Sequence, residues 1–143
     1  MMEIQDKEKM FIEEIKIIQD IIKRMADNSF KIKGWSVTLI VIALLFKNKT
    51  DLGPFVAFLP LLSFWLLDTY YLRMERVYRK IYGWVVQNRA TSNEYFFDLN
   101  PRRFEKDVDG YVKTMFSITL LIFHGSLTVL LIIFSSIELF GGK

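Results

Sequence analysis

Three stretches of this 143-residue chain contain no Asp, Glu, Lys or Arg, although these residues make up 24% of the whole sequence. The uncharged stretches are residues 34–46, 52–67 and 114–137. An α-helix needs roughly 20 apolar residues to cross a hydrocarbon core about 30 Å thick. The third stretch has 24 residues, so it is the strongest prediction of a transmembrane helix. For the two shorter stretches, buried helices of a soluble bundle are the alternative.

The two shorter stretches are predicted to form a transmembrane hairpin. The first is flanked by Lys33 and Lys47, whose aliphatic stems can follow the helix to headgroup water. The second reaches spanning length if it continues to Leu72, which places Asp68 near one membrane interface. Only residues 47–51 separate the two stretches, and a Gly-Pro pair follows as a turn and helix-start signal.

The distribution of Lys and Arg predicts the topology. Sixteen of the 19 basic residues precede the first stretch or lie between the second and third. The positive-inside rule therefore places both regions, and the N-terminus, in the cytoplasm. We expect an all-α membrane protein with about three spans. Its predicted parts are a cytoplasmic amphipathic helix (1–29), a hairpin of two spans (30–72), a helical cytoplasmic region rich in bases and aromatics (73–113), a third transmembrane helix (114–137) and a short outside tail (138–143).

Composition argues against several classes of chemistry. The absence of Cys excludes a disulfide scaffold, thiol catalysis and a cysteine zinc site, and a single His cannot form a histidine metal cluster. We therefore expect no metal, no cofactor and no enzymatic activity. The two intramembrane candidates for chemistry, Asp68 and His124, are expected at opposite ends or depths and lack a nucleophile motif. The charged first residues also indicate no cleaved signal peptide.

The N-terminal helix is predicted to bury an apolar stripe. Apolar residues recur there at heptad spacing, and charged residues occupy other faces. The stripe fits packing on the same chain or contact between subunits. Its mixed charge disfavours a helix lying on the membrane, because such helices tend to be strongly basic. The stripe consists of Ile4, Phe11, Ile15, Ile18, Ile22 and Met25.

Asp68, Glu75 and Arg79 are the candidates for gating or for ion pairing. They fall on one face of a helix that is predicted to continue from the second span to Gln87. An ionised carboxylate in or near the bilayer is costly unless it meets a cation, water or a hydrogen-bond donor. The expected partners of Asp68 are Arg73, Arg76 or Lys33. Two interpretations of Asp68 stay open. It forms a structural ion pair or hydrogen bond, or it is a carboxylate on an ion pathway.

The region from Tyr70 to Phe104 interleaves bases with aromatics, and a helix is predicted to begin near Pro101. Such pairing binds single-stranded nucleic acids, because cations follow the phosphates while aromatic rings stack on bases. The same residue types also anchor proteins at membrane interfaces. The candidates for binding an anionic ligand are Arg73, Arg76, Lys80, Arg89, Arg102 and Arg103.

A polar stripe is predicted along one face of the third span. Copied around a symmetric oligomer, it would line an axis with rings of Ser, Thr and His, separated by Leu constrictions that gate by dewetting. Ordinary helix packing through small hydroxyl residues is the alternative. The pore-lining candidates are Ser117, Leu121, His124, Thr128, Leu131 and Ser135.

The segment 64–83, FWLLDTYYLRMERVYRKIYG, resembles a pattern in small bacterial membrane proteins in which a span ends in Leu-Asp and continues through aromatic and Glu-Arg positions. The whole architecture is similar to that of anti-phage membrane effectors of the Hailong type. The resemblance implies a homotetrameric channel in the bacterial inner membrane. It also implies control by single-stranded oligodeoxyadenylate from a partner nucleotidyltransferase. No site residue is carried over from it.

Together, these patterns predict a homo-oligomeric inner-membrane channel. We expect a cytoplasmic anionic ligand to gate it, with a short single-stranded oligonucleotide as the predicted ligand. The open channel would depolarise the membrane in anti-phage defence. The expected partners are the lipid bilayer and further copies of the chain. The alternative is a non-channel membrane adaptor or assembly protein, in which the helical stripes are packing surfaces only.

Overall fold

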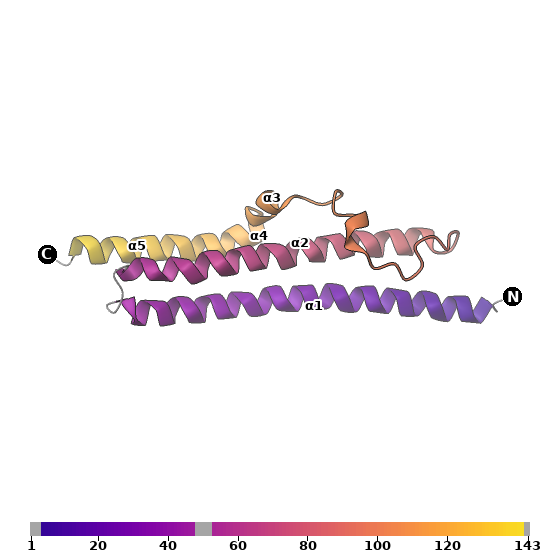
Figure 1. The fold of residues 1–143 in the computed structure, drawn as a ribbon, viewed down its shortest axis with the longest axis horizontal. Helices are drawn as coiled ribbons and strands as arrows, with labels where there is room; N and C mark the ends of the chain where they lie inside the picture. Colours follow the sequence, from indigo (N-terminus) through magenta and orange to yellow (C-terminus); the bar gives the residue numbers. More distant parts are fainter. Residues whose placement is uncertain (1–3, 48–52, 142–143) are drawn as a thin grey trace.

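A computed structural model describes residues 4–47 and 53–141, and helices are the only regular structure within these ranges. Three long helical segments run side by side (Figure 1). They are α1 (Ile4–Leu45), α2 (Phe58–Asn88) and a third segment that ends with α5 (Ser126–Gly141). The end of α1, the start of α2 and the C-terminal end of α5 lie at one end of the bundle. The start of α1 and the end of α2 lie at the other.

Each long segment is long and apolar enough to cross a membrane. The candidate spans lie within the helical segments Gln5–Leu45, Gly53–Asn88 and Ile118–Phe140. This confirms the predicted all-α class with three possible spans. Residues 48–51 of the predicted hairpin turn lie outside the described residues, as do the first three residues and the last two.

The predicted N-terminal amphipathic helix and first span form one helix. α1 has 42 residues, about 63 Å at the usual rise of 1.5 Å per residue, or twice the thickness of a hydrocarbon core. Its first half therefore extends well beyond the apolar half. α2 also continues past its apolar half as predicted, with no break before Asn88.

The short 3₁₀ turn η2 (Gly53–Ala57) leads into α2. Gly53 has a φ of +54°, a conformation that glycine adopts readily because it has no Cβ. Pro54 follows at the start of the turn, where its missing N–H removes no helical hydrogen bond. Gly53 and Pro54 thus form a turn and the start of a helix, as the sequence predicts.

The third span differs from the predicted single helix 114–137. The chain forms α3 (Tyr111–Met115), becomes extended at Ser117 with a ψ of 151°, and starts again as α4 (Ile118–Leu120). A π-helical turn, η4 (Leu121–Gly125), connects α4 to α5. The candidate span therefore begins after Ser117, at Ile118, and it continues to Phe140, within the predicted outside tail.

Side chains seven residues apart form three layers between the spans. This heptad spacing keeps the same face of each helix turned toward its neighbours. The middle layer is the apolar core of the bundle, and Ala57 packs with it. From the N-terminal end, the layers consist of Lys33 with Asp68 and His124, of Ile40 with Leu61 and Leu131, and of Lys47 with Glu138.

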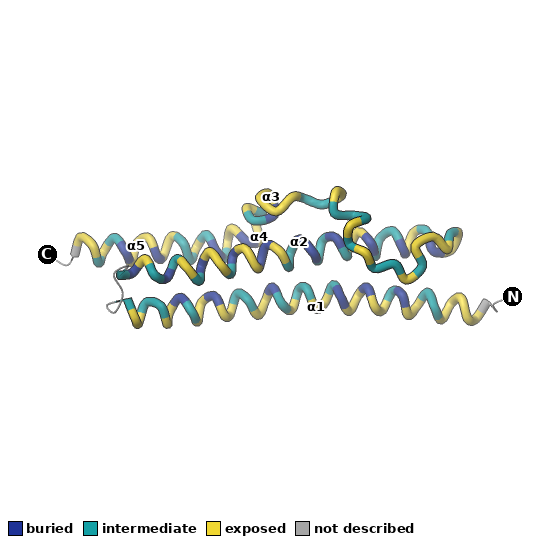
Figure 2. Tube along the Cα trace, in the orientation of Figure 1, coloured by how far each residue is buried: buried dark blue, intermediate teal, exposed yellow. Residues whose placement is uncertain are grey.

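Beyond the spans, α1 and α2 pack together as a two-helix stalk. Its core contains Ile18, Ile81 and Val85, and Phe11, Ile15 and Ile22 pack against it. This part of the predicted heptad stripe therefore packs within the chain, whereas the side chain of Ile4 lies outside the described residues. Buried positions recur along both helices toward this contact (Figure 2). The segment 89–110 folds back along the stalk and includes η3 (Pro101–Arg103), a single 3₁₀ turn at the predicted helix start.

Candidate functional site

The three spans meet at Asp68, which is fully buried. The Lys33 ammonium of α1 lies 2.7 Å from Asp68 Oδ2, and His124 Nε2 lies 2.9 Å from the same oxygen. The Ser29 hydroxyl donates a hydrogen bond to Asp68 Oδ1 and accepts one from Lys33 at 2.8 Å. We call Ser29, Lys33, Asp68 and His124 the charged cluster.

His124 enters the charged cluster from the π-helical turn η4, a feature that occurs frequently at functional sites. The Trp65 ring stacks on the imidazole, with the two ring centroids 5.6 Å apart and the planes 11° from parallel. A carboxylate can only accept hydrogen bonds, so Nε2 carries the proton toward Asp68. The other nitrogen, Nδ1, is buried and has no hydrogen-bond partner among the described residues.

This geometry corrects two expectations. His124 and Asp68 do not lie at opposite ends or depths, because the break at Ser117 and the π-helical turn bring the imidazole level with the carboxylate. Lys33 does not extend to headgroup water. Its side chain turns inward and is only 21% exposed. Of the three partners expected for Asp68, Lys33 is therefore the one that binds it.

The charged cluster fixes the three spans relative to one another. Removing one partner of a buried ion pair typically costs about 3–5 kcal/mol, because the remaining charge is left without compensation. Asp68 accepts from groups on α1 and on the third span at once. Separation of either helix therefore leaves a buried carboxylate or a cation with fewer partners.

A second ion pair lies on the other side of the apolar layer from the charged cluster. Lys47 Nζ lies 2.6 Å from Glu138 Oε2 and 4.7 Å from the centroid of the Phe134 ring. Lys33 and Lys47 are 14 residues apart, or about 21 Å along α1. The two ion pairs are thus closer together than a hydrocarbon core is thick.

The predicted pore stripe does not lie on one open face. His124, Leu131 and Ser135 are almost fully buried within the protomer, whereas Leu121 is 45% exposed. Thr128 is partly buried and donates to the His124 carbonyl at 2.7 Å. The stripe loses its alignment because the extended Ser117 and the wider π-helical turn change the helical phase. Most of its polar groups face the other two spans.

Buried polar atoms without a partner recur along the interface between the spans. In the part of the chain that the structure describes, Ser36 Oγ and Ser135 Oγ are such atoms, as are His124 Nδ1 and Ser117 Oγ. Ser36 is fully buried and Ser135 is 3% exposed. Most buried polar groups in proteins have a hydrogen-bond partner, so each exception calls for an explanation such as a bound water.

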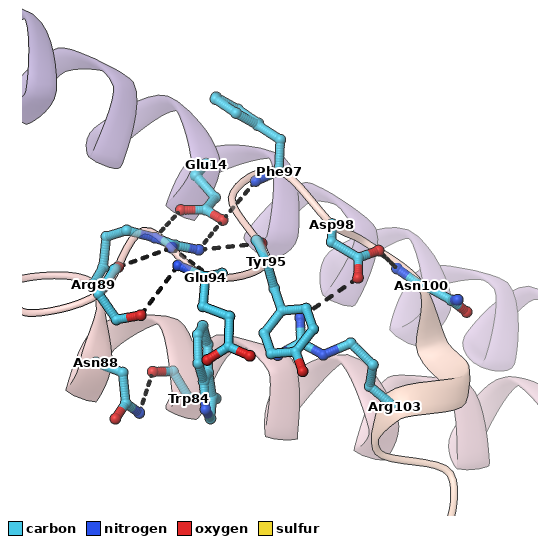
Figure 3. Close-up of polar contacts among 11 residues, drawn as sticks. Glu14, Trp84, Asn88, Arg89, Glu94, Tyr95, Phe97, Asp98, Asn100 and Arg103 are labelled. Carbon is cyan, nitrogen blue, oxygen red and sulfur yellow. Dashed lines mark hydrogen bonds and ion pairs between the residues drawn. The ribbon is translucent and has the colours of Figure 1, made fainter.

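At the far end of the stalk, Glu14 and Arg89 form a buried ion pair (Figure 3). Arg89 Nη2 lies 2.6 Å from Glu14 Oε1, and Nε donates to Oε2 at 2.7 Å. The Phe97 amide also donates to Glu14, at 3.0 Å. The remaining donors of Arg89 bind the carbonyls of Ser92, Glu94 and Tyr95. Arg89, a predicted ligand contact, instead holds the loop 90–97 on the stalk.

Arg103 is also bound within the chain. Its guanidinium lies 3.5 Å from the centroid of the Tyr95 ring and 4.8 Å from that of the Trp84 ring. Its Nη1 lies 3.8 Å from Asp98 Oδ2. Figure 3 shows Arg103 beside Tyr95 and Asp98. A third ring, that of Phe104, has its centroid 5.1 Å away, so three cation–π contacts and one ion pair stabilise the fold of this loop.

Arg73 and Arg76 hold the returning segment against α2. The buried Arg73 donates to the carbonyls of Asp109 and Glu105 at 3.1 and 2.9 Å. Arg76 lies 3.4 Å from the Asp109 carboxylate. A hydrogen bond from Lys113 lowers the pKa of Asp109, and the nearby charges of Lys113 and Arg76 act in the same direction. This segment therefore ends in a charged anchor before the third span begins.

The remaining predicted cations are accessible. Arg76, Arg79 and Lys80 line an open hollow of about 590 Å³, together with Asp107 and Asp109. Glu75 lies 2.7 Å from Arg79, as expected for an i,i+4 pair, and the Arg79 side chain is 62% exposed. This pair lies away from the charged cluster. Arg102 is exposed as well.

Sequence reasoning missed Glu14 and Ser29 as buried groups. Glu14 was assigned to a charged face, although it lies four residues before Ile18 and seven before Ile21, which are both buried. The heptad spacing of Glu14 from these apolar residues was the signal that could have predicted its burial. Within the described residues, no group of three or more His, Cys, Asp or Glu side chains is placed to hold a metal ion.

Comparison with family models, with curated proteins and with solved structures finds no match for this chain.

Proposed function

We propose that the protein is a homo-oligomeric channel of the bacterial inner membrane, with its N-terminus in the cytoplasm, and that an anionic cytoplasmic ligand controls it. The observation that carries the proposal is the charged cluster. Ionisable residues within membrane spans are costly, and they usually mark ion pathways, proton relays or sensors. Here one carboxylate, one ammonium and one imidazole from three different spans share a single buried site.

The position of the charged cluster suits a gate. It lies where the α1–α2 stalk enters the apolar layers, and Asp68 belongs to the same continuous helix as Arg76 and Lys80. A ligand bound to the stalk changes the equilibrium only if it binds the open and closed states with different affinities. A shift of α2 against α1 that separates Lys33 from Asp68 would supply such a difference.

The ligand class follows from the accessible cations. Lys80 and Arg102 are exposed and available for phosphate contacts, and Arg76 lines the same hollow as Lys80. Tyr95 and Tyr111 are exposed in the chain between α2 and the third span. Bases with aromatics are the groups that bind single-stranded nucleic acids. We accordingly propose a short single-stranded oligonucleotide, for which the resemblance to Hailong-type effectors suggests oligodeoxyadenylate, a tetramer and a role in anti-phage defence.

A membrane adaptor is the second candidate. The observation that favours it is the burial of His124, Leu131 and Ser135 inside one protomer, because a stripe that is already packed does not line an axis between subunits. The two functions differ in conductance. Purified protein of known oligomeric mass, reconstituted into planar bilayers with and without short oligodeoxyadenylate, passes ligand-sensitive current if it is a channel. A discrete oligomer that never conducts is the result that the adaptor predicts.

A further inference from the structure

We propose that each protomer contains its own proton path, which runs between the three spans from the Lys47–Glu138 ion pair to the charged cluster. This inference rests on the proposed transport function and names the ion that the protomer carries. It replaces an axis between subunits with a route inside one chain, because the buried polar groups lie there.

The path is marked by buried polar atoms that lack protein partners. Ser36 follows Lys33 by three residues on α1, and Ser135 precedes Glu138 by three residues on α5. Both hydroxyls are buried without a hydrogen bond among the described residues. His124 Nδ1, in the charged cluster, is also buried without a hydrogen-bond partner among the described residues. Water bound at these atoms would satisfy them and form a chain of hydrogen bonds.

One apolar layer interrupts the path. Ile40, Leu61 and Leu131 form it, and all three are at most 5% exposed. On α1, Ser36 lies four residues before Ile40, and on α5, Ser135 lies four residues after Leu131. The gap between the two serine levels is thus about 12 Å, a few water molecules in length. Apolar constrictions of this kind gate by dewetting.

The geometry favours a proton over a metal cation. The apolar layer between the spans is filled by side chains with almost no exposure, so it leaves no lumen for a hydrated ion. A proton needs only hydrogen-bonded hydroxyls, waters and a group that takes up and releases it. His124 presents one nitrogen to Asp68 and the other, Nδ1, toward no protein partner.

The transfer through the charged cluster balances. A proton from water binds the free electron pair of Nδ1 and makes the ring an imidazolium. The Nε2 proton then passes to Asp68, which returns the ring to neutrality. Asp68 releases that proton through the Ser29 hydroxyl to water at the N-terminal end, and transfer of the Nδ1 proton to Nε2 through bound water restores the starting tautomer. One proton enters and one leaves, so the net charge of the cluster is unchanged.

Ser36→Ala provides the sharpest test, because it removes a hydroxyl that makes no bond to the described protein and leaves the apolar packing in place. The matched control is Ser63→Ala, on the exposed side of α2, whose hydroxyl donates to the Leu59 carbonyl of its own helix at 2.9 Å. Proteoliposomes carry a pH-sensitive dye, and a potassium diffusion potential drives the flux, with and without oligodeoxyadenylate. We expect Ser36→Ala to lower proton uptake at least tenfold and Ser63→Ala to change it less than twofold.

His124→Gln is the second variant, since glutamine can still donate to Asp68 but cannot relay a proton. It should abolish proton uptake, with thermal unfolding in detergent recorded to confirm folding. Equal proton uptake by wild type, Ser36→Ala and folded His124→Gln overturns the inference. Sodium flux is recorded in parallel vesicles. Sodium flux without proton uptake in the wild type overturns the inference alone, and absence of both fluxes overturns the proposed channel as well.

Discussion

The buried Glu14–Arg89 pair offers a quantitative test of the stalk. Glu14→Gln keeps the size of the side chain but leaves the Arg89 guanidinium, 4% exposed, without its counter-charge. Breaking a buried pair by removing one partner costs about 3–5 kcal/mol. Because about 1.4 kcal/mol corresponds to a tenfold change in an equilibrium constant, the loop 90–97 should open at least about 100-fold more often.

The Phe97 amide reports this opening directly, because it donates to Glu14 Oε1. Hydrogen exchange followed by mass spectrometry measures its protection in detergent-solubilised protein. The matched control is Glu75→Gln, which breaks the pair with the exposed Arg79 and should cost no more than about 0.5 kcal/mol, or roughly a twofold change. Similar exchange rates in Glu14→Gln and Glu75→Gln would refute the assignment.

Three further predictions follow from the site. Leu131→Ser puts a hydroxyl into the apolar layer and should raise ion flux and toxicity without ligand, whereas Leu121→Ser on the exposed face should not; equal effects in growth and flux assays would contradict the buried route. Lys113→Met should raise the pKa of Asp109 toward its ordinary value, as followed by NMR titration of the carboxyl carbon. Because the folded pKa is lowered, ionised Asp109 stabilises its segment above the ordinary carboxyl pKa, and that contribution is lost as the pH falls through the lowered value. Lys80→Gln with Arg102→Gln should weaken oligonucleotide binding and reduce the slope of log affinity against log salt by about 0.7 per lost phosphate contact; an unchanged slope in fluorescence anisotropy would place the ligand elsewhere.

Much of the fold was predictable because it follows from local features of the sequence. The uncharged stretches predict three apolar helices, and Gly53 with Pro54 predicts the entry into the second. The continuation of α2 to Asn88 was also predictable, since proline is absent from that stretch of the helix. These features depend on the period and length of a helix, which the residue pattern records directly.

The charged cluster was only partly predictable, because it depends on how three helices align. Asp68 stood out as a charge that needs a partner, and Lys33 was one of its expected partners. The contact with His124 depends on the break at Ser117 and on the π-helical turn. Neither feature could be predicted from a proline or from a regular residue pattern. The inward direction of the pore stripe depends on the same change of helical phase.

The basic region shows the opposite difficulty. Composition identified its six candidate cations. It could not separate the accessible side chains from those that bind other groups of the same chain. Arg73, Arg89 and Arg103 bind backbone carbonyls, a buried carboxylate or aromatic rings of the chain itself. Those partners lie up to 75 residues away in the sequence, so only the tertiary structure brings them together.

Recording the current through oligomers that carry Asp68→Asn tests the central claim most directly. The asparagine keeps the shape of the side chain and removes the charge that Lys33 and His124 share. Glu75→Gln, two turns after Asp68 on the same helix, is the matched control. If the charged cluster governs conduction, oligomers of wild-type mass that carry Asp68→Asn will lose ligand-sensitive current in planar bilayers, while Glu75→Gln will keep it. Unchanged ligand-sensitive current in a folded Asp68→Asn oligomer would contradict the account.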